Sequence, residues 1–190
     1  MRKSTISILA FMAILLACPA PGLTQAQKPA PKPAGSSVDE LVDAWNEIGR
    51  KLVEMAEDWP EARYDYKPVS DVRSFRGLLL HIAGSNYFFI HPVAGREMGD
   101  AADDPDPAKF KTKPDVVAFL KKSFADGAAI IRQQGAAGLQ KEVRNPFSNQ
   151  LAHAQAWWYM GVGHGAEHYG NLVTYYRLNN LVPPESRPRK

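Results

Sequence analysis

Hydrophobic residues recur at three- and four-residue steps over four separate stretches of the chain, which is the spacing of amphipathic helices. The stretches are 36–59, 74–91, 112–138 and 149–180. Ser37 and Glu40 predict a capping box at the start of the first stretch, and Ser74 is a good N-cap for the second. Polar connections join the stretches and no strand-like alternation is present. The pattern therefore predicts an all-α fold, a four-helix bundle.

The fourth stretch is interrupted by glycines at positions 161, 163, 165 and 170. Each glycine costs up to about 1 kcal/mol relative to alanine in a helix. We therefore expect close helix packing or access to a site at these positions. The second stretch should end or kink at His91-Pro92, and the third should end at Gly135–Gly138.

Two histidines in the fourth stretch suggest chemistry. His164 and His168 are four residues apart, so on a helix they share one face and can bind one metal ion. His81 lies on the apolar stripe of the second stretch, so three imidazoles converge if the two helices are neighbours. Three neutral imidazoles leave a coordination position open, as in catalytic sites, and suit divalent Zn, Ni, Fe or Cu.

The competing interpretation of each histidine is an ordinary core residue. His153 lies eleven residues before His164, where it would line the same cavity but could not reach the same ion. His91 follows the expected helix break and should be exposed. Glu167 is a candidate proton acceptor or a partner that supports a metal ligand, unless it forms a surface salt bridge. Further candidate pocket groups are Asn86, Tyr87, Tyr159 and Tyr169.

The segment His164-Gly-Ala-Glu-His168 also matches the inverted zinc-peptidase signature, in which the glutamate is the general base. That interpretation requires a further acidic ligand downstream. Only Glu185 follows the motif, in a proline-rich segment, so a peptidase is the less favoured alternative.

The N-terminus has the pattern of a secretory signal. Arg2 and Lys3 precede the apolar run 6–17, which is short for a membrane span. Cleavage after Ala26 would release an exported chain, periplasmic or extracellular. The alternative is a lipoprotein anchored to the membrane through Cys18, the only cysteine, which also rules out an internal disulfide. Residues 27–35 are rich in proline and predict an extended tether.

The charge balance argues against nucleic acid as a partner. The chain has 23 basic and 20 acidic residues, and removal of 1–26 takes away two of the basic ones, leaving it nearly neutral. No basic block occurs outside the short tail, 187–190.

Two segments resemble the DinB-like (DinB/YfiT) superfamily. They are Arg73-Ser-Phe-Arg-Gly-Leu-Leu-Leu-His-Ile-Ala-Gly-Ser-Asn-Tyr87 and His164-Gly-Ala-Glu-His-Tyr-Gly-Asn-Leu-Val-Thr-Tyr-Tyr-Arg-Leu-Asn179, the second followed by Val182-Pro-Pro-Glu-Ser186. The resemblance implies a DinB-like bundle over 36–186, a divalent metal ion on His81, His164 and His168, and often a homodimer.

The resemblance implies less about the reaction. Characterised relatives include thiol-dependent transferases and isomerases as well as hydrolases, and their thiol cofactors are cytoplasmic. For an exported chain we therefore expect a metal-dependent hydrolase that acts on a small-molecule substrate through metal-bound water. The alternatives are a thiol-dependent transferase and a metal-binding bundle without catalysis.

Overall fold

Four long α-helices form the framework of the chain. The structure, a computed structural model, describes residues 35–96, 105–145 and 148–188. The helices are α1 (Ser37–Asp58), α2 (Phe75–Val93), α3 (Lys113–Leu139) and α4 (Ala154–Leu178), so the predicted four-helix bundle is confirmed. The predicted signal 1–26, Cys18 and all of the tether except residue 35 lie outside the described residues. Within the described ranges, no helix is both long and apolar enough to cross a membrane.

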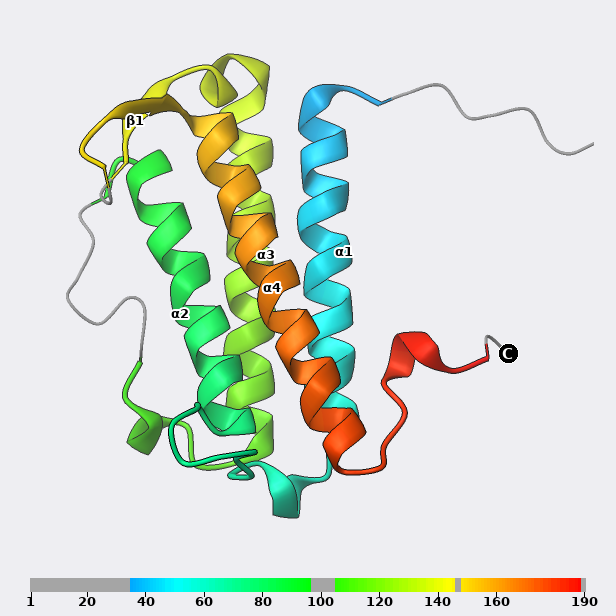
Figure 1. The fold of residues 1–190 in the computed structure, drawn as a ribbon. Helices are drawn as coiled ribbons and strands as arrows, with labels where there is room; N and C mark the ends of the chain where they lie inside the picture. The colour runs from blue at the N-terminus through cyan, green and yellow to red at the C-terminus, as the bar shows by residue number, and fades with distance from the viewer. Residues whose placement is uncertain (1–34, 97–104, 146–147, 189–190) are drawn as a thin grey trace, which may run out of the picture. The chain divides into compact units, whose positions relative to one another are not determined.

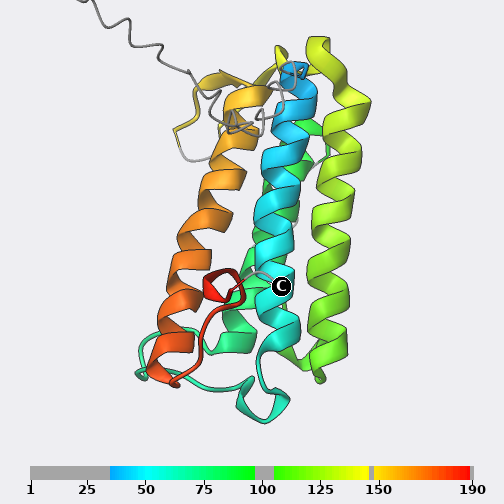
Figure 2. The same cartoon turned by 90° about the vertical axis from the view of Figure 1, so that its right-hand side faces the viewer.

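The order of the helices around the bundle brings α2 beside α4. α1 packs mainly against α3 and α4, and α2 also packs mainly against α3 and α4. Consecutive helices α1 and α2 therefore occupy opposite corners (Figures 1 and 2). α2 and α3 run in the same direction, whereas α1 and α4 run in the other (Figure 1). Residues of α2 thus face residues of α4 that lie far away in the sequence.

Four buried tryptophans connect the helices. Indole Nε1 of Trp45 on α1 donates to the carbonyl of Phe124 on α3, and Nε1 of Trp157 on α4 donates to the carbonyl of Phe89 on α2. Trp59 and Trp158 donate to Arg63 O and to Gln134 Oε1, respectively. Every indole N–H in the core therefore has an acceptor, so none of the four large side chains is buried at the cost of an unpaired donor.

Close helix packing explains some of the glycines. A Cβ atom on Gly161 would lie 3.0 Å from the Trp45 indole, and one on Gly165 would lie 3.1 Å from Ile48. Both contacts join α4 to α1, as the packing prediction required. Gly163 and Gly170 have no described atom within 4 Å of such a Cβ atom, so packing does not explain them.

α1 begins at Ser37, as predicted, but its predicted capping box and the predicted start of the fourth helix are wrong. The capping box of α1 uses Ser36 and Asp39, not Ser37 and Glu40, because Ser37 is already helical. The fourth helix does not begin near Asn149. Residues 151–153 form the short strand β2 (Leu151–His153), which pairs antiparallel with β1 (Glu142–Arg144), so α4 begins only at Ala154.

Two predicted helix ends also shift. α2 continues through Pro92 to Val93, so the proline lies in its last turn. α3 is interrupted at Gly135, within the predicted end at Gly135–Gly138: this residue has a non-helical backbone with φ 60° and ψ −175°, which glycine tolerates. A further short helical segment follows this kink and continues to Leu139.

Candidate metal centre

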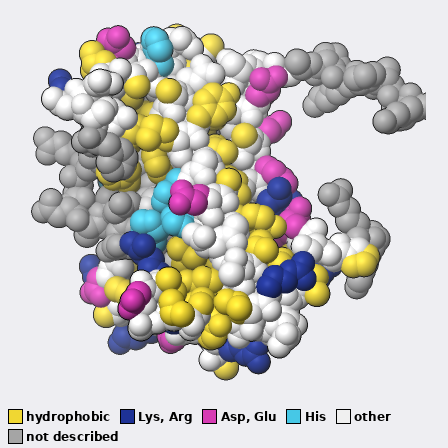
Figure 3. Space-filling view, viewed as in Figure 1, with side chains coloured by type: hydrophobic (Ala, Val, Ile, Leu, Met, Phe, Trp, Pro, Cys, Tyr) yellow, Lys and Arg dark blue, Asp and Glu magenta, His cyan; other side chains and the backbone are white. Residues whose placement is uncertain are grey.

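The three predicted histidines come together between α2 and α4. Nε2 of His164 lies 3.3 Å from Nε2 of His81 and 3.0 Å from Nε2 of His168. The ligand atoms of the three rings all lie within 4.8 Å of one another, and each residue is half-buried. Figure 3 shows the imidazoles grouped at the surface in the middle of one face of the bundle. The cluster is therefore open to molecules from solvent.

Helix geometry explains why these side chains meet. His164 and His168 are one turn apart on α4, which places their rings edge to face with centroids 4.4 Å apart. His81 reaches them from the neighbouring antiparallel helix, with its ring centroid 5.1 Å from that of His164. The ring of Phe89, also on α2, lies 5.7 Å from the His164 ring and forms an apolar wall behind it.

The nitrogen separations fit a shared ion. Zinc binds imidazole nitrogen at about 2.0–2.1 Å, so the separations of 3.0 and 3.3 Å correspond to N–metal–N angles of about 94° and about 107°. Neutral imidazoles cannot form a good hydrogen bond across both of these Nε2–Nε2 contacts at once. Nε2 of His164 carries either one hydrogen or one lone pair, yet it faces two other ring nitrogens. One cation between the rings would use all three lone pairs at once.

A pocket of about 460 Å³ opens beside His168. Its wall is formed by the segment that precedes α2 and by the last turns of α4. The lining residues are Pro68, Asp71, Val72, Arg73, Leu78, His168, Asn171, Thr174 and Tyr175. This volume is within the range of small-molecule sites, about 300–1,000 Å³. The sequence pattern did not indicate this pocket, because its outer wall is an irregular segment.

Asn171 is a second feature that the sequence pattern did not indicate. Its amide nitrogen, Nδ2, lies 3.2 Å from Nδ1 of His168, the ring nitrogen that is not part of the contacts among the three imidazoles. The spacing of three residues along a helix could have suggested this contact. Asn171 also lines the pocket, so it joins the histidine cluster to the pocket.

Glu167 is exposed on α4 and is not part of the ligand cluster. Glu185, the acid that a peptidase would require, forms a salt bridge of 2.8 Å with Arg50. The acidic ligand of the peptidase signature is therefore not brought to the histidines.

The other two histidines lie elsewhere. His153 is the N-cap residue of α4, and its Nδ1 lies 2.8 Å from the carbonyl oxygen of Gln140, so it does not line the histidine cavity. His91 is half-buried in the last turn of α2, which corrects the expectation that it is exposed. Burial lowers the pKa of His91, and the charge of Arg96 lowers it further.

The remaining candidate pocket groups have structural roles instead. The Tyr87 hydroxyl donates to Asp126, and burial followed by this hydrogen bond raises the pKa of Tyr87 to about 12. Asn86 donates to Ser123 in the core. Two tyrosines remain: Tyr159 is exposed, and the ring of Tyr169 lies 6.0 Å from the Lys51 ammonium.

Comparison with known proteins identifies the family. The sequence model of the DinB superfamily matches residues 44–172, which include all three histidines. This chain belongs to the DinB superfamily. No curated protein sequence matches the DinB chain.

Solved structures share its fold. A DinB-like protein from Bacillus subtilis, YjoA, has a TM-score of 0.61 and 23% identity over 80% of this chain and 99% of its own. YfiT from Bacillus subtilis is described as a probable metal-dependent hydrolase with an unusual four-helix bundle topology. It has a TM-score of 0.57 and 15% identity, over 81% of this chain and 94% of its own. A DinB-like protein from Bacillus cereus has a TM-score of 0.65 and 12% identity, over 77% of this chain and 95% of its own.

Proposed function

We propose that this DinB protein is an exported hydrolase that depends on one divalent metal ion held by His81, His164 and His168. The observation that carries the proposal is the convergence of three Nε2 atoms at 3.0 and 3.3 Å on a solvent-accessible face. The description of YfiT as a probable metal-dependent hydrolase supports the same chemistry.

The ligand set favours a catalytic site over a structural one. Three neutral imidazoles supply no negative charge, so the divalent charge stays available to polarise a fourth ligand. An ion held in this way acts as a Lewis acid and lowers the pKa of bound water to about 7. His81, His164 and His168 would hold the ion, and His168 also lines the 460 Å³ pocket, where a substrate could bind. Glu167, exposed and next to His168, is the nearest candidate in sequence to accept a proton.

The decisive experiment measures metal content and metal affinity. Protein purified without a histidine tag is freed of metal with a chelator and then incubated separately with Zn²⁺, Ni²⁺ and Fe²⁺. The metal bound per protein is measured by inductively coupled plasma mass spectrometry. We expect one equivalent in the wild type and loss of binding in His81→Ala and His164→Ala. His153→Ala is the matched control, because its ring contacts a backbone carbonyl outside the cluster, and it should retain the metal. Less than about a tenth of an equivalent in the wild type would overturn the proposal.

Activity assays then separate the three functions. Turnover of esters or amides by the metal-loaded protein, lost in His168→Ala, is the expected result. Turnover only when a low-molecular-weight thiol is added would instead assign a transferase. Stoichiometric metal without either activity would assign a binding bundle.

We also propose export through the signal in residues 1–26, followed by function as a homodimer. The mass of the mature protein tests the first part. Cleavage after Ala26 gives an unmodified N-terminus, whereas a lipid mass that disappears in Cys18→Ser would assign a membrane-anchored form. Sedimentation of the mature protein measures the dimer.

A further inference from the structure

Apolar side chains from three parts of the chain line the pocket beside His168. They are Pro68 and Val72 from the segment before α2, Leu78 from α2, and Tyr175 from α4. Leu78 and Tyr175 are buried, whereas Val72 is 38% exposed. Figure 3 shows hydrophobic side chains gathered on the same face as the histidines, below them in that view. A ligand in this pocket therefore contacts hydrocarbon from both helices and from the segment before α2.

The polar side chains that α4 adds to the pocket already make contacts within the protein. Thr174 Oγ1 donates to Gly170 O at 3.3 Å, and Nδ2 of Asn171 lies 3.2 Å from Nδ1 of His168. The Tyr175 hydroxyl donates to a backbone carbonyl of the segment before α2 at 2.7 Å. A polar group of a ligand therefore gains less from these side chains than it would from unpaired ones.

The two charged residues of the lining do not favour a ligand of either sign. Asp71 and Arg73 are both exposed and carry opposite charges. The Asp71 carboxylate accepts a hydrogen bond from the Ser70 hydroxyl at 2.8 Å. Arg73 already has an interaction partner and also lines a neighbouring pocket with Pro105 and Pro107. What remains for recognition is the apolar part of the wall.

We propose that the pocket binds an uncharged aliphatic chain, which lies against Val72, Leu78 and Tyr175. Attraction between apolar surfaces has no preferred direction and grows with the area removed from water, so such a pocket selects by length and volume. His168 belongs to both the pocket and the histidine cluster, so the polar end of the bound molecule lies toward the cluster. This inference names aliphatic esters or amides as the substrate class of the proposed hydrolase and rests on that function, although binding of the chain itself requires no metal ion.

The pocket also limits the length of the chain. α4 contributes His168, Asn171, Thr174 and Tyr175 to the lining. From the first to the last of these residues, the helix rises by about 10 Å. Affinity should therefore increase with chain length until the hydrocarbon fills this distance, and longer chains should gain clearly less.

The test titrates butan-1-ol, hexan-1-ol, octan-1-ol and decan-1-ol into the purified, metal-free protein. The amide signals of Asn171 and Thr174, which line the pocket, are followed by NMR. Each buried methylene contributes up to about a fourfold gain, so hexan-1-ol should bind about tenfold more tightly than butan-1-ol. The gain from octan-1-ol to decan-1-ol should be smaller. Affinity that does not increase with chain length would overturn the inference.

Two valines of one segment provide a variant and its matched control. Val72→Asn should weaken hexan-1-ol binding by about three- to tenfold, because a partly exposed valine contributes part of its apolar surface. Val69→Asn should leave it unchanged, because Val69 is 59% exposed and does not line the pocket. Thr174→Val, which replaces a hydroxyl in the lining by a methyl group, should strengthen binding. Equal effects of the two asparagine variants would assign the binding to another surface.

The two proposals fail separately. A protein that binds zinc on its histidines but shows no dependence on alcohol chain length refutes the inference about the pocket alone. A protein that shows this dependence without binding any metal refutes the proposed metal-dependent function and leaves a bundle that binds aliphatic chains. If both hold, the zinc-loaded protein should hydrolyse the 4-nitrophenyl ester of hexanoate with a higher kcat/KM than that of acetate, and Val72→Asn should reduce the difference.

Discussion

The side-chain amide of Asn171 lies 3.2 Å from Nδ1 of His168, one turn further along α4. A neutral imidazole carries its hydrogen on only one ring nitrogen. If Nε2 of His168 offers its lone pair to a metal ion, the hydrogen must be on Nδ1. In this structure the amide nitrogen, Nδ2, of Asn171 faces Nδ1, so metal binding requires the amide to turn over and present its oxygen as the acceptor. Metal binding and the orientation of this amide are therefore coupled.

Replacing Asn171 should change zinc affinity without changing the ligands. We expect Asn171→Leu to weaken zinc binding by about ten- to a hundredfold, because partners of ligating histidines have effects of this size. Asn171→Asp should retain the affinity or increase it, since a carboxylate is a stronger acceptor. Competition with a chromophoric chelator measures both. Asn46→Leu, an exposed substitution on α1, is the control, and an unchanged affinity in Asn171→Leu would contradict the coupling.

Two glycine substitutions should have opposite effects on stability. A Cβ atom on Gly127 would lie 2.4 Å from the Trp45 indole, so Gly127→Ala should lower the free energy of unfolding by about 1–3 kcal/mol. Gly163→Ala meets no described atom within 4 Å and should raise it by up to about 1 kcal/mol, because alanine favours the helix. Urea unfolding of the two variants tests the pair. Equal effects would show that helix propensity, not packing, decides both.

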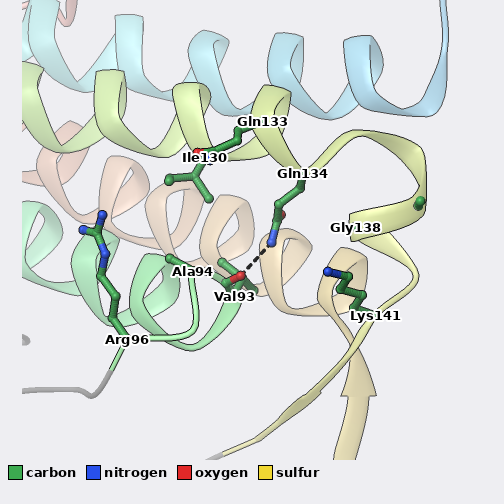
Figure 4. A pocket seen from close by; sticks show the side chains of 9 residues that line it. Val93, Ala94, Arg96, Ile130, Gln133, Gln134, Gly138 and Lys141 are labelled. Atoms are coloured by element: carbon green, nitrogen blue, oxygen red, sulfur yellow. Dashed lines mark hydrogen bonds between the residues drawn. The ribbon is translucent and has the colours of Figure 1, made fainter.

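Gln134 provides a third prediction. Its Nε2 donates to Val93 O at 2.8 Å (Figure 4), and its Oε1 accepts from the buried Trp158 indole at 2.8 Å. In Gln134→Leu, water in the adjacent pocket of about 390 Å³ can hydrate the Val93 carbonyl, but the indole N–H loses its acceptor. We expect a loss of about 1–3 kcal/mol in unfolding free energy.

A double-mutant cycle isolates the indole contribution. In a Trp158→Phe background the donor is absent, so Gln134→Leu should cost clearly less there than in the wild type. Equal costs in both backgrounds would assign the effect to lost side-chain packing.

The salt bridge between Arg187 and Asp58 should make stability depend on pH. The hydrogen bond from the Arg187 guanidinium is the largest cause of the lowered pKa of Asp58. A carboxyl group with a lowered pKa in the folded state stabilises above its unfolded value, near 3.8, and loses this contribution as the pH falls through the folded value. Arg187→Gln should cost less than about 1 kcal/mol at pH 7, since both groups are partly exposed.

The cost of Arg187→Gln should disappear in acid, once Asp58 is protonated in both proteins. Thermal unfolding at pH 7 and at pH 2 measures the difference. Arg132→Gln is the matched control, because Arg132 is exposed and makes no ion pair with a described residue. A cost that is the same at both pH values would contradict the electrostatic explanation.

Hydrophobic periodicity was sufficient to predict the bundle and to place the three histidines on inward faces, but their meeting also depends on α2 lying beside α4, which periodicity does not determine. The spacing of His164 and His168 depends only on helix geometry, and His81 lies on a stripe whose apolar neighbours must face the core. The choice between two adjacent candidate capping boxes at the start of α1 was harder to predict. Ser36-Asp39 and Ser37-Glu40 both fit the capping pattern, and only the backbone of residue 37 decides between them.

Features that depend on irregular backbone could not be predicted from periodicity. The pairing of β1 with β2 involves three residues on each side, and a positive φ of 56° at Asn149 precedes β2. The pocket beside His168 depends on where residues 68–73 lie against α4, which Tyr175 fixes through one hydrogen bond to a carbonyl. Neither contact has a repeating sequence pattern.

The order of the helices has a consequence for engineering. His81 belongs to the part of the chain before residue 146, whereas His164 and His168 belong to the part after it. If the chain is cut between α3 and α4, each fragment contains an incomplete ligand set. Zinc should therefore promote reassembly of the two fragments, and a fluorescent reporter divided between them would turn the bundle into a zinc-operated switch.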